Sequence, residues 1–252
     1  MILGILQARM SSTRLPSKVL TKIVGKPMLL LQLERLKRSN LMDKLVVATT
    51  ESSSDDIIVE LCNANEISFF RGSEDDVLDR YYNCAKQFDP DYIVRLTGDD
   101  PLTDPELIDS MIEKIKLLGC DAITNSLKPT YPEGLDITII KYEVLREAWM
   151  KSKLMSEREH VTPYIFDPIN EFSVSHYQQK KDLSSLRWTV DYEEDIEFMR
   201  LIYKSLYSNN KNFSTKDIYE LIEKKPFLKE INSNITRNAG LIKSLENDKE
   251  ID

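Results

Sequence analysis

The sequence predicts an α/β fold: a mostly parallel sheet, helices on both of its faces and a less regular second half. The strongest evidence is the order of the segments along the chain: short apolar β-prone segments alternate with segments whose apolar residues recur at helical spacing. The chain of 252 residues is long enough for one large domain with its own core. Its 41% hydrophobic and 30% charged residues are ordinary for a globular protein, which excludes low-complexity disorder, collagen and small disulfide scaffolds.

The first half supplies most of the expected sheet. We expect strands over residues 2–7, 44–49, 67–70 and 92–96. A first helix begins at Pro27, and leucines recur at helical spacing as far as Leu36. Further helices are expected over residues 54–64, 74–88 and 104–118. Asp104 is a good cap for the last of these, and Pro105 suits its first helical position.

The second half is less regular. Pro129, Pro132 and Gly134 precede a strand-like run at residues 135–140. Two further strands are expected over residues 171–178 and 187–190, and helices over residues 141–152, 156–166, 192–207 and 214–224. From Phe227 onward the chain is polar and weakly periodic. We therefore expect one domain over residues 1–225 and a docked C-terminal tail over residues 226–252 that frays at its end.

Simple counts disfavour several classes of protein. No apolar run approaches the roughly 18 residues that a membrane span needs, and the N-terminus is typical of a first strand, not of a signal peptide. Cys62, Cys84 and Cys120 lack C-x-x-C spacing, so we expect buried thiols, no zinc site or disulfide, and a cytoplasmic location. The net charge of −8 argues against nucleic acid or an anionic membrane as a partner.

Positive charge is concentrated near the N-terminus. Residues 1–40 carry a formal charge of +7, so the rest of the chain carries −15. The loop after the first strand includes three cations and two adjacent serines: Arg9, Ser11, Ser12, Arg14 and Lys18. Cations, hydroxyls and backbone N–H groups at the carboxyl end of a strand suit a polyphosphate, although the spacing matches neither a Walker A loop nor G-x-G-x-x-G. Solvated surface charge is the alternative explanation.

Acidic residues at two other positions could complete such a site. Asp99 and Asp100 follow the strand at 92–96, and adjacent carboxylates there suit Mg²⁺, which binds carboxylate and phosphate oxygens. The alternative explanation for these two residues is a turn that precedes a helix cap. Asp191 follows the run at 187–190, and by itself it is best explained as a helix cap. It gains a functional role only if the fold brings it near Asp99.

The two histidines give no support for nucleophilic hydrolase chemistry. No Ser-His-Asp or Cys-His arrangement is visible around His160 or His176. His160 lacks neighbours with metal-ligand spacing, so packing or capping explains it on residue type alone.

Seven segments, taken in order, carry a family resemblance. The first reads ILQARMSSTRLPSKVL, and together they cover residues 5–20, 25–28, 72–81, 98–102, 133–136, 158–164 and 187–191. They resemble the cytidylyltransferases, which include the CMP-Kdo and CMP-acylneuraminate synthetases, and within that family the SpsF-like spore-coat polysaccharide biosynthesis subgroup. The match extends over about residues 2–207. The first segment is specific, and the others are strong as a set.

The resemblance implies a Rossmann-like nucleotidyltransferase fold. It also implies an enzyme that transfers CMP from CTP to an acceptor and releases pyrophosphate. Mg²⁺, with Mn²⁺ as an alternative, would be held by Asp99 and Asp191, and the catalytic cations would be Arg9, Arg14 and Lys18. The implied nucleotide-binding residues are Gln7, Ala8, Arg9, Ser11, Ser12, Arg14, Lys18, Arg80, Thr97 and Asp99. Relatives usually have glycine in place of Ser17; glycine allows close backbone approach to phosphate, so serine is expected to affect the conformation of the loop but not its cations.

The acceptor side is implied more loosely. An insertion over about residues 127–180 would shape the acceptor pocket and a homodimer contact, and the candidate acceptor-binding residues are Tyr131, Glu133, Asp136 and His160. A small acidic sugar for surface polysaccharide or glycoconjugate biosynthesis is the familiar acceptor. Two alternatives stay open: a glycosyltransferase of the nucleotide-sugar-binding type, with Asp99 and Asp100 as its metal motif, and a catalytically silent nucleotide-binding protein.

Overall fold

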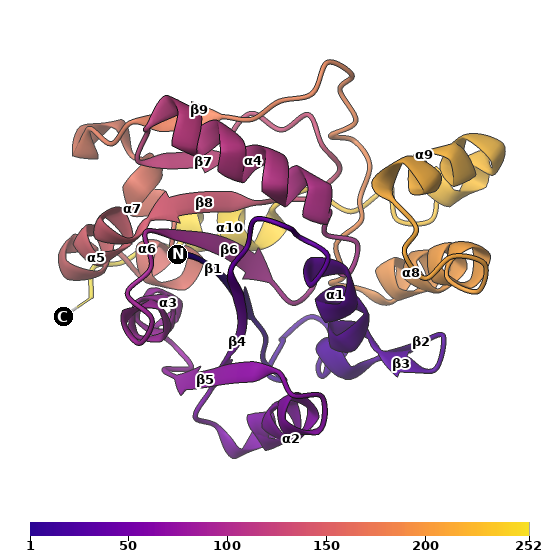
Figure 1. Cartoon of the computed structure of the whole chain (residues 1–252), viewed down its shortest axis with the longest axis horizontal. Helices are drawn as coiled ribbons and strands as arrows, with labels where there is room; N and C mark the ends of the chain where they lie inside the picture. Colours follow the sequence, from indigo (N-terminus) through magenta and orange to yellow (C-terminus); the bar gives the residue numbers. More distant parts are fainter. Residues whose placement is uncertain (252) are drawn as a thin grey trace.

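The computed structural model describes residues 1–251 and has the predicted α/β architecture (Figure 1). The seven strands of its sheet are β1 (Ile2–Gln7), β4 (Lys44–Thr50), β5 (Ser68–Gly72), β6 (Tyr92–Thr97), β7 (Ala122–Thr124), β8 (Thr138–Lys141) and β9 (Val174–His176). Their order is β5-β4-β1-β6-β8-β7-β9. β8 runs antiparallel to both of its neighbours, and the other pairs are parallel. A separate hairpin pairs β2 (Lys22–Ile23) with β3 (Lys26–Pro27).

The register of the sheet brings two polar loops together. β1 and β6 pair in parallel with Gln7 opposite Thr97. The N–H of Gly98 donates to the carbonyl of Gln7 at 2.7 Å, and a Cβ at Gly98 would lie only 2.9 Å from that oxygen. The loops that follow the two strands therefore leave the sheet side by side, at the edge where open α/β sheets bind ligands.

Helices cover the two faces of the sheet in two apolar layers (Figure 1). One layer contains α1 (Met28–Leu36), α2 (Asp56–Ala64), α4 (Pro105–Leu118), α8 (Glu193–Leu206) and α9 (Thr215–Lys224). The other contains α3 (Val77–Lys86), α5 (Tyr142–Lys151), α6 (Met155–His160) and α7 (Pro163–Phe166). The central strands bury side chains on both faces, as expected for strands covered on both sides. No helix in the described part of the chain combines the length and the apolar character that a bilayer span requires.

The bounds of α4 follow from its local sequence. The side chain of Asp104 accepts the N–H of Glu106 at 2.9 Å, and Pro105 occupies the first helical position. Gly119, in the left-handed region with φ of 66°, ends the helix. The predicted start and end of this helix are confirmed.

Two predictions for the second half are wrong. Residues 187–190 form no strand, because Arg187 makes a single bridge to Glu133 and the N–H of Val190 donates instead to the carbonyl of Asp99, at 2.9 Å. The segment is apolar because it packs in the core, not because it pairs in the sheet. The single helix expected over residues 156–166 is split into α6 and α7 at Val161, whose φ of 72° no helix can contain. The short strand β7 was not predicted, since three buried residues give no periodic signal.

The C-terminal tail docks, but it also contains a helix that the sequence did not predict. A 3₁₀ turn at Pro226–Lys229 is followed by α10 (Ala239–Glu246), which contacts α6. The carboxylate of Asp248 accepts the N–H and the hydroxyl of Ser156 at 2.9 and 2.5 Å. We call residues 234–251 the C-terminal strap. The domain boundary near residue 225 stays a prediction.

Candidate active site

Two adjoining cavities open at the carboxyl ends of β1 and β6. The smaller, of about 190 Å³, is lined by the loop after β1 and by the turn after β6. The larger, of about 580 Å³, extends over β8 toward the C-terminal strap. The residues that line both are Gln7, Arg9, Arg14, Thr97, Asp99, Glu159, His160 and Gly240. The basic loop and the irregular second half therefore face one continuous space.

Lys18 lies at the centre of charge in the smaller cavity. Only 8% of its side chain is exposed. Its Nζ donates to the carboxylates of Asp99 and Asp191 and to the carbonyl of Val190, each at 2.8 Å. Burial alone would lower the pKa of Lys18, but the two carboxylates outweigh burial and raise it. The ammonium group therefore stays charged at neutral pH.

Asp191 is held by three cations. Its Oδ1 accepts from Arg14 at 2.6 Å as well as from Lys18, and its Oδ2 accepts from Arg187 at 3.3 Å. Burial would raise the pKa of Asp191, but Lys18 and Arg14 lower it to about 2. Asp99 and Asp191, far apart in the sequence, thus meet on one ammonium group.

A buried ion network fixes the position of Asp191. The guanidinium of Arg187 donates to the carboxylate of Asp195 at 2.9 and 3.0 Å and to that of Glu133 at 2.7 Å. Asp195 is fully buried; it also accepts the N–H of Asp191 at 2.8 Å and the amide of Asn232 at 2.8 Å. Removing one partner would leave an uncompensated buried charge, so Arg187 and Asp195 are positioning residues for Asp191.

Asp99 and Asp191 can be compared with the ligands that Mg²⁺ requires. This ion prefers carboxylate and phosphate oxygens and takes few of its ligands from protein. Across residues 1–251, no three His, Cys, Asp or Glu side chains gather where they could hold a metal ion. Asp99 and Asp191 nevertheless share a cation already, the ammonium of Lys18. This pair fits a divalent ion whose remaining ligands come from nucleotide phosphates and water, provided that Lys18 takes new partners.

Asp100 differs from its neighbour Asp99. Its side chain is buried and accepts the hydroxyl of Thr97 at 2.7 Å, while its carbonyl accepts the hydroxyl of Thr103 at 2.6 Å. Burial, with the nearby charges of Asp99 and Asp136, raises the pKa of Asp100 well above its ordinary range. Asp100 therefore shapes the turn after β6.

Most of the predicted nucleotide-binding residues line the smaller cavity: Gln7, Ala8, Arg9, Ser12, Arg14, Lys18, Thr97 and Asp99. The hydroxyl of Ser11 donates instead to the carboxylate of Glu74 at 2.6 Å. Arg80 lies outside both cavities; it is fully buried and donates to the carbonyl of Ser73. Ser17 adopts the left-handed conformation, with φ of 62°, that glycine would favour. The loop therefore keeps the backbone path of a glycine at an energetic cost.

Three of the predicted acceptor-binding residues, Glu133, Asp136 and His160, line the larger cavity. Tyr131 does not, because its ring stacks on that of Tyr177. Burial lowers the pKa of His160, although Glu159 opposes that change. The Nε2 of His160 is buried and finds no hydrogen-bond partner within residues 1–251, so it is available to a ligand.

The sequence analysis missed two parts of the larger cavity. The C-terminal strap contributes Thr236, Asn238, Ala239, Gly240, Leu241 and Leu245. The N–H of Asn238 donates to Glu133 at 2.9 Å, and Arg237 pairs with Asp136. β6 contributes Arg95, whose place in an apolar strand was an unused signal. The sequence of the strap gave no such signal, because the residues that hold it, Glu133, Asp136 and Ser156, are polar and scattered through the second half.

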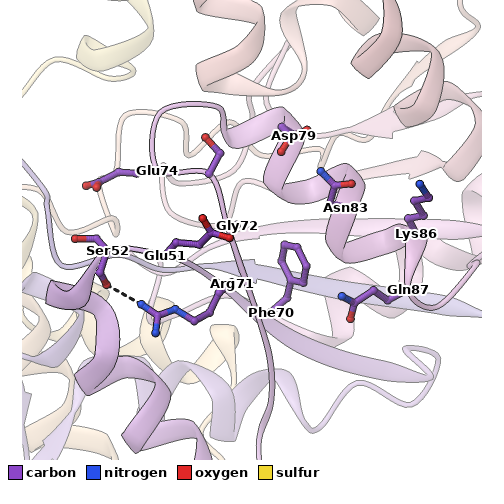
Figure 2. A pocket seen from close by; sticks show the side chains of 11 residues that line it. Glu51, Ser52, Phe70, Arg71, Gly72, Glu74, Asp79, Asn83, Lys86 and Gln87 are labelled. Atoms are coloured by element: carbon purple, nitrogen blue, oxygen red, sulfur yellow. Dashed lines mark hydrogen bonds between the residues drawn. The ribbon is translucent and has the colours of Figure 1, made fainter.

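Another hollow, of about 1020 Å³, lies beside β5 and α3 at the edge of the sheet. Figure 2 shows Asn83 and Lys86 on α3 and Gln87 just after it, all beside the hollow. Arg71 donates to the carbonyl of Ser52 at 2.8 Å. None of the predicted site residues is among those that line it. Despite its size, we assign it no part of the site.

Comparisons with known proteins agree with this geometry. A family model described as "Cytidylyltransferase" matches residues 3–235. The chain is 39% identical over 240 residues to an uncharacterized protein of Methanocaldococcus jannaschii, covering 94% of this chain and 97% of that one. It is 32% identical over 234 residues to the spore coat polysaccharide biosynthesis protein SpsF of Bacillus subtilis, covering 89% and 95%. A solved cytidylyltransferase of Leptospira borgpetersenii superposes with a TM-score of 0.87 at 35% identity, covering 93% of this chain and 98% of that one. The chain therefore belongs to the cytidylyltransferase family of nucleotidyltransferases.

Proposed function

We propose that this protein transfers CMP from CTP to a small acidic sugar or a related small acceptor, with release of pyrophosphate, in surface polysaccharide or glycoconjugate biosynthesis. Membership of the family supports the nucleotidyl transfer. The observation that carries the proposal is the meeting of Lys18 with Asp99 and Asp191, beside a cavity large enough for a second substrate. Mg²⁺, with Mn²⁺ as an alternative, is the proposed metal.

The triphosphate fits the smaller cavity, where Arg9, Arg14 and Lys18 supply positive charge. Because Lys18 already donates to three acceptors, phosphate oxygens must replace the carboxylates as its partners. As Lys18 and Arg14 turn to the phosphates, Asp99 and Asp191 become free to hold the metal. Charge stays balanced through this exchange, so we expect nucleotide and metal to bind together.

The reaction then depends on position and charge. An acceptor oxygen in the larger cavity attacks the α-phosphorus in line, the bond from that phosphorus to the bridging oxygen breaks, and negative charge develops on the departing pyrophosphate. Lys18 and Arg14 stabilise that charge, while Arg187 and Asp195 hold Asp191 in place. Bound Mg²⁺ would supply further neutralisation of the phosphate oxygens.

A pyrophosphate-release assay tests this function, with each of the four nucleoside triphosphates against acidic and phosphorylated sugars. The expected result is release from CTP that requires an acceptor. Transfer of sugar from a nucleotide sugar without pyrophosphate would identify a glycosyltransferase instead. Binding of CTP without turnover across the panel would identify a silent nucleotide-binding protein.

The metal assignment has its own test. Asp99→Asn should abolish stimulation of turnover by Mg²⁺ or Mn²⁺, because it removes one of two carboxylates from the metal site. Asp104→Asn is the matched control, since asparagine caps α4 as well as aspartate does. Equal metal stimulation in the two variants would contradict the assignment.

We also propose that the protein forms a homodimer through the insertion at about residues 127–180. Light scattering over a range of protein concentrations should give twice the mass of one chain. A single-chain mass at every concentration would contradict this part of the proposal.

A further inference from the structure

Arg95 occupies a position where an apolar side chain would be expected. It lies on β6 between Ile93 and Thr97, and Ile93 packs in the apolar layer of α3 and α5. Because side chains two residues apart share a face of a strand, Arg95 projects toward the same layer. There it lines the larger cavity but not the smaller one. Its charge therefore belongs to the acceptor side of the site, away from the triphosphate loop.

Within residues 1–251, the guanidinium of Arg95 forms no ion pair with a carboxylate. Its Nε is buried, with no hydrogen-bond acceptor anywhere in the described 251 residues. The other arginines that line the larger cavity are all partnered: Arg9 donates to the carbonyl of Glu74, Arg14 pairs with Asp191, and Arg187 pairs with Glu133. A partly buried cation without a counter-charge is costly in a folded protein. Its position at a cavity wall indicates that the missing counter-charge comes from a ligand.

The surroundings of Arg95 favour a strong interaction with an anion. Asp136, an acid of the same cavity, is already paired with Arg237 of the C-terminal strap. Leu241, Leu245 and Phe166 contribute apolar surface to the same cavity and lower the local dielectric constant. An anion that enters this space would therefore meet a cation that the protein itself leaves unmatched.

We propose that Arg95 binds an anionic group of the acceptor, a carboxylate or a phosphoryl group, and so determines acceptor specificity. The planar guanidinium presents paired N–H donors that match either group in a bidentate arrangement. His160 lines the same cavity, and its Nε2 has no hydrogen-bond partner among the described residues, so it can contact the neighbouring part of such a ligand. That the ligand is the acceptor rests on the proposed function, but the binding of the anion requires neither CTP nor turnover.

Stability separates a binding role from a structural one. Arg95→Met removes the unmatched charge and keeps an unbranched side chain in its place. In the ligand-free protein, the melting temperature of this variant should therefore equal or exceed that of the wild type. Arg35→Met is the matched control: Arg35 is also buried, but it donates to the carbonyls of Thr103 and Phe213, so its loss should lower the melting temperature. A decrease for Arg95→Met as large as that for Arg35→Met would overturn the proposal.

Binding is measured by NMR through His160, which has only His176 as a second histidine signal to resolve. The probes are D-glucuronate, D-glucose 6-phosphate and uncharged D-glucose, added without CTP. One or both anions should shift the His160 signal saturably while glucose does not, and the arm that responds identifies carboxylate or phosphoryl. In Arg95→Met this anion affinity should fall by roughly tenfold or more, the size of one lost charge-assisted interaction.

Three outcomes of binding measurements would also overturn the proposal: no anion binding to the wild type, unchanged anion affinity in Arg95→Met, or an equal loss of CTP affinity in that variant. Failure of the proposed function is a different result. It appears as absent pyrophosphate release, whatever the His160 signal does.

Discussion

The two sides of the site balance their charges in different ways. On the nucleotide side, Lys18 and Arg14 are neutralised by Asp99 and Asp191 before any ligand binds. On the acceptor side, Arg95 is left unmatched and the C-terminal strap forms a wall. The first arrangement suits an exchange of partners, in which phosphates and metal enter together. The second suits selection, because only a ligand with its own negative charge completes it.

Removal of Lys18 should have the largest effect, because this residue joins both carboxylates of the nucleotide side. Lys18→Ala should lower turnover roughly 100-fold or more, as expected for loss of one preorganised transition-state donor. Lys22→Ala, at an exposed position of the same segment, is the control. The measurement is pyrophosphate release, with circular dichroism to confirm the fold. Near wild-type turnover in Lys18→Ala would remove this residue from the mechanism.

Acid should destabilise the nucleotide side through Asp191. The pKa of Asp191 is lowered from 3.8 to about 2, so its contribution to stability is complete above about pH 4 and is lost as the pH falls through 2. A shift of this size corresponds to roughly 2 kcal/mol.

Urea unfolding at a series of pH values measures this contribution. In Asp191→Asn, the free energy of unfolding should depend less on pH between 4 and 2 than in the wild type. Asp75→Asn, at an exposed position, is the control and should follow the wild type. An unchanged pH dependence in Asp191→Asn would show that its ion pairs contribute little.

Removal of most of the C-terminal strap should affect the acceptor side more than the nucleotide side. Deleting residues 236–252 removes six residues that line the larger cavity, so the KM for the acceptor should rise roughly tenfold, or about 1.4 kcal/mol. The KM for CTP should change far less. Lys243→Ala, an exposed position on α10, is the control for nonspecific effects on the strap. A parallel rise in both KM values would mean that the two sides are not separable in this way.

The smallest effect is expected at Ser17. Its left-handed backbone costs a serine more than a glycine, but glycine also loses more entropy on folding. Ser17→Gly should therefore raise the free energy of unfolding by only about 0.5 kcal/mol, with turnover unchanged. Chemical denaturation measures the difference, and a clear loss of stability would contradict the strain assigned to this loop.

The comparison also shows what the sequence could predict. The nucleotide side follows from short contiguous segments: the loop from Gln7 to Lys18 follows β1, and Asp99 follows β6. Because β1 and β6 are parallel neighbours in the sheet, these loops lie at one edge of it. At Ser17, the sequence left open only the energetic cost of the backbone conformation, because the cations around it do not depend on that one residue.

The acceptor side could not be predicted in the same way, because segments that are far apart in the sequence build it. The pairing of Arg237 with Asp136 and the contact of α10 with α6 join residues that are far apart in the sequence. Tyr131 has the right chemistry for a ligand contact, but its ring is used in stacking on Tyr177. Arg95 was visible as a charge within a strand, and only the fold shows that this charge is unmatched.

The most direct test of the central claim is a crystal structure with CTP and Mn²⁺, in which anomalous scattering locates the metal. Our account predicts one manganese peak bound by the carboxylates of both Asp99 and Asp191, with the ammonium of Lys18 moved onto a phosphate oxygen. A metal bound elsewhere, or Lys18 still seated between the two carboxylates while the nucleotide is bound, would contradict it.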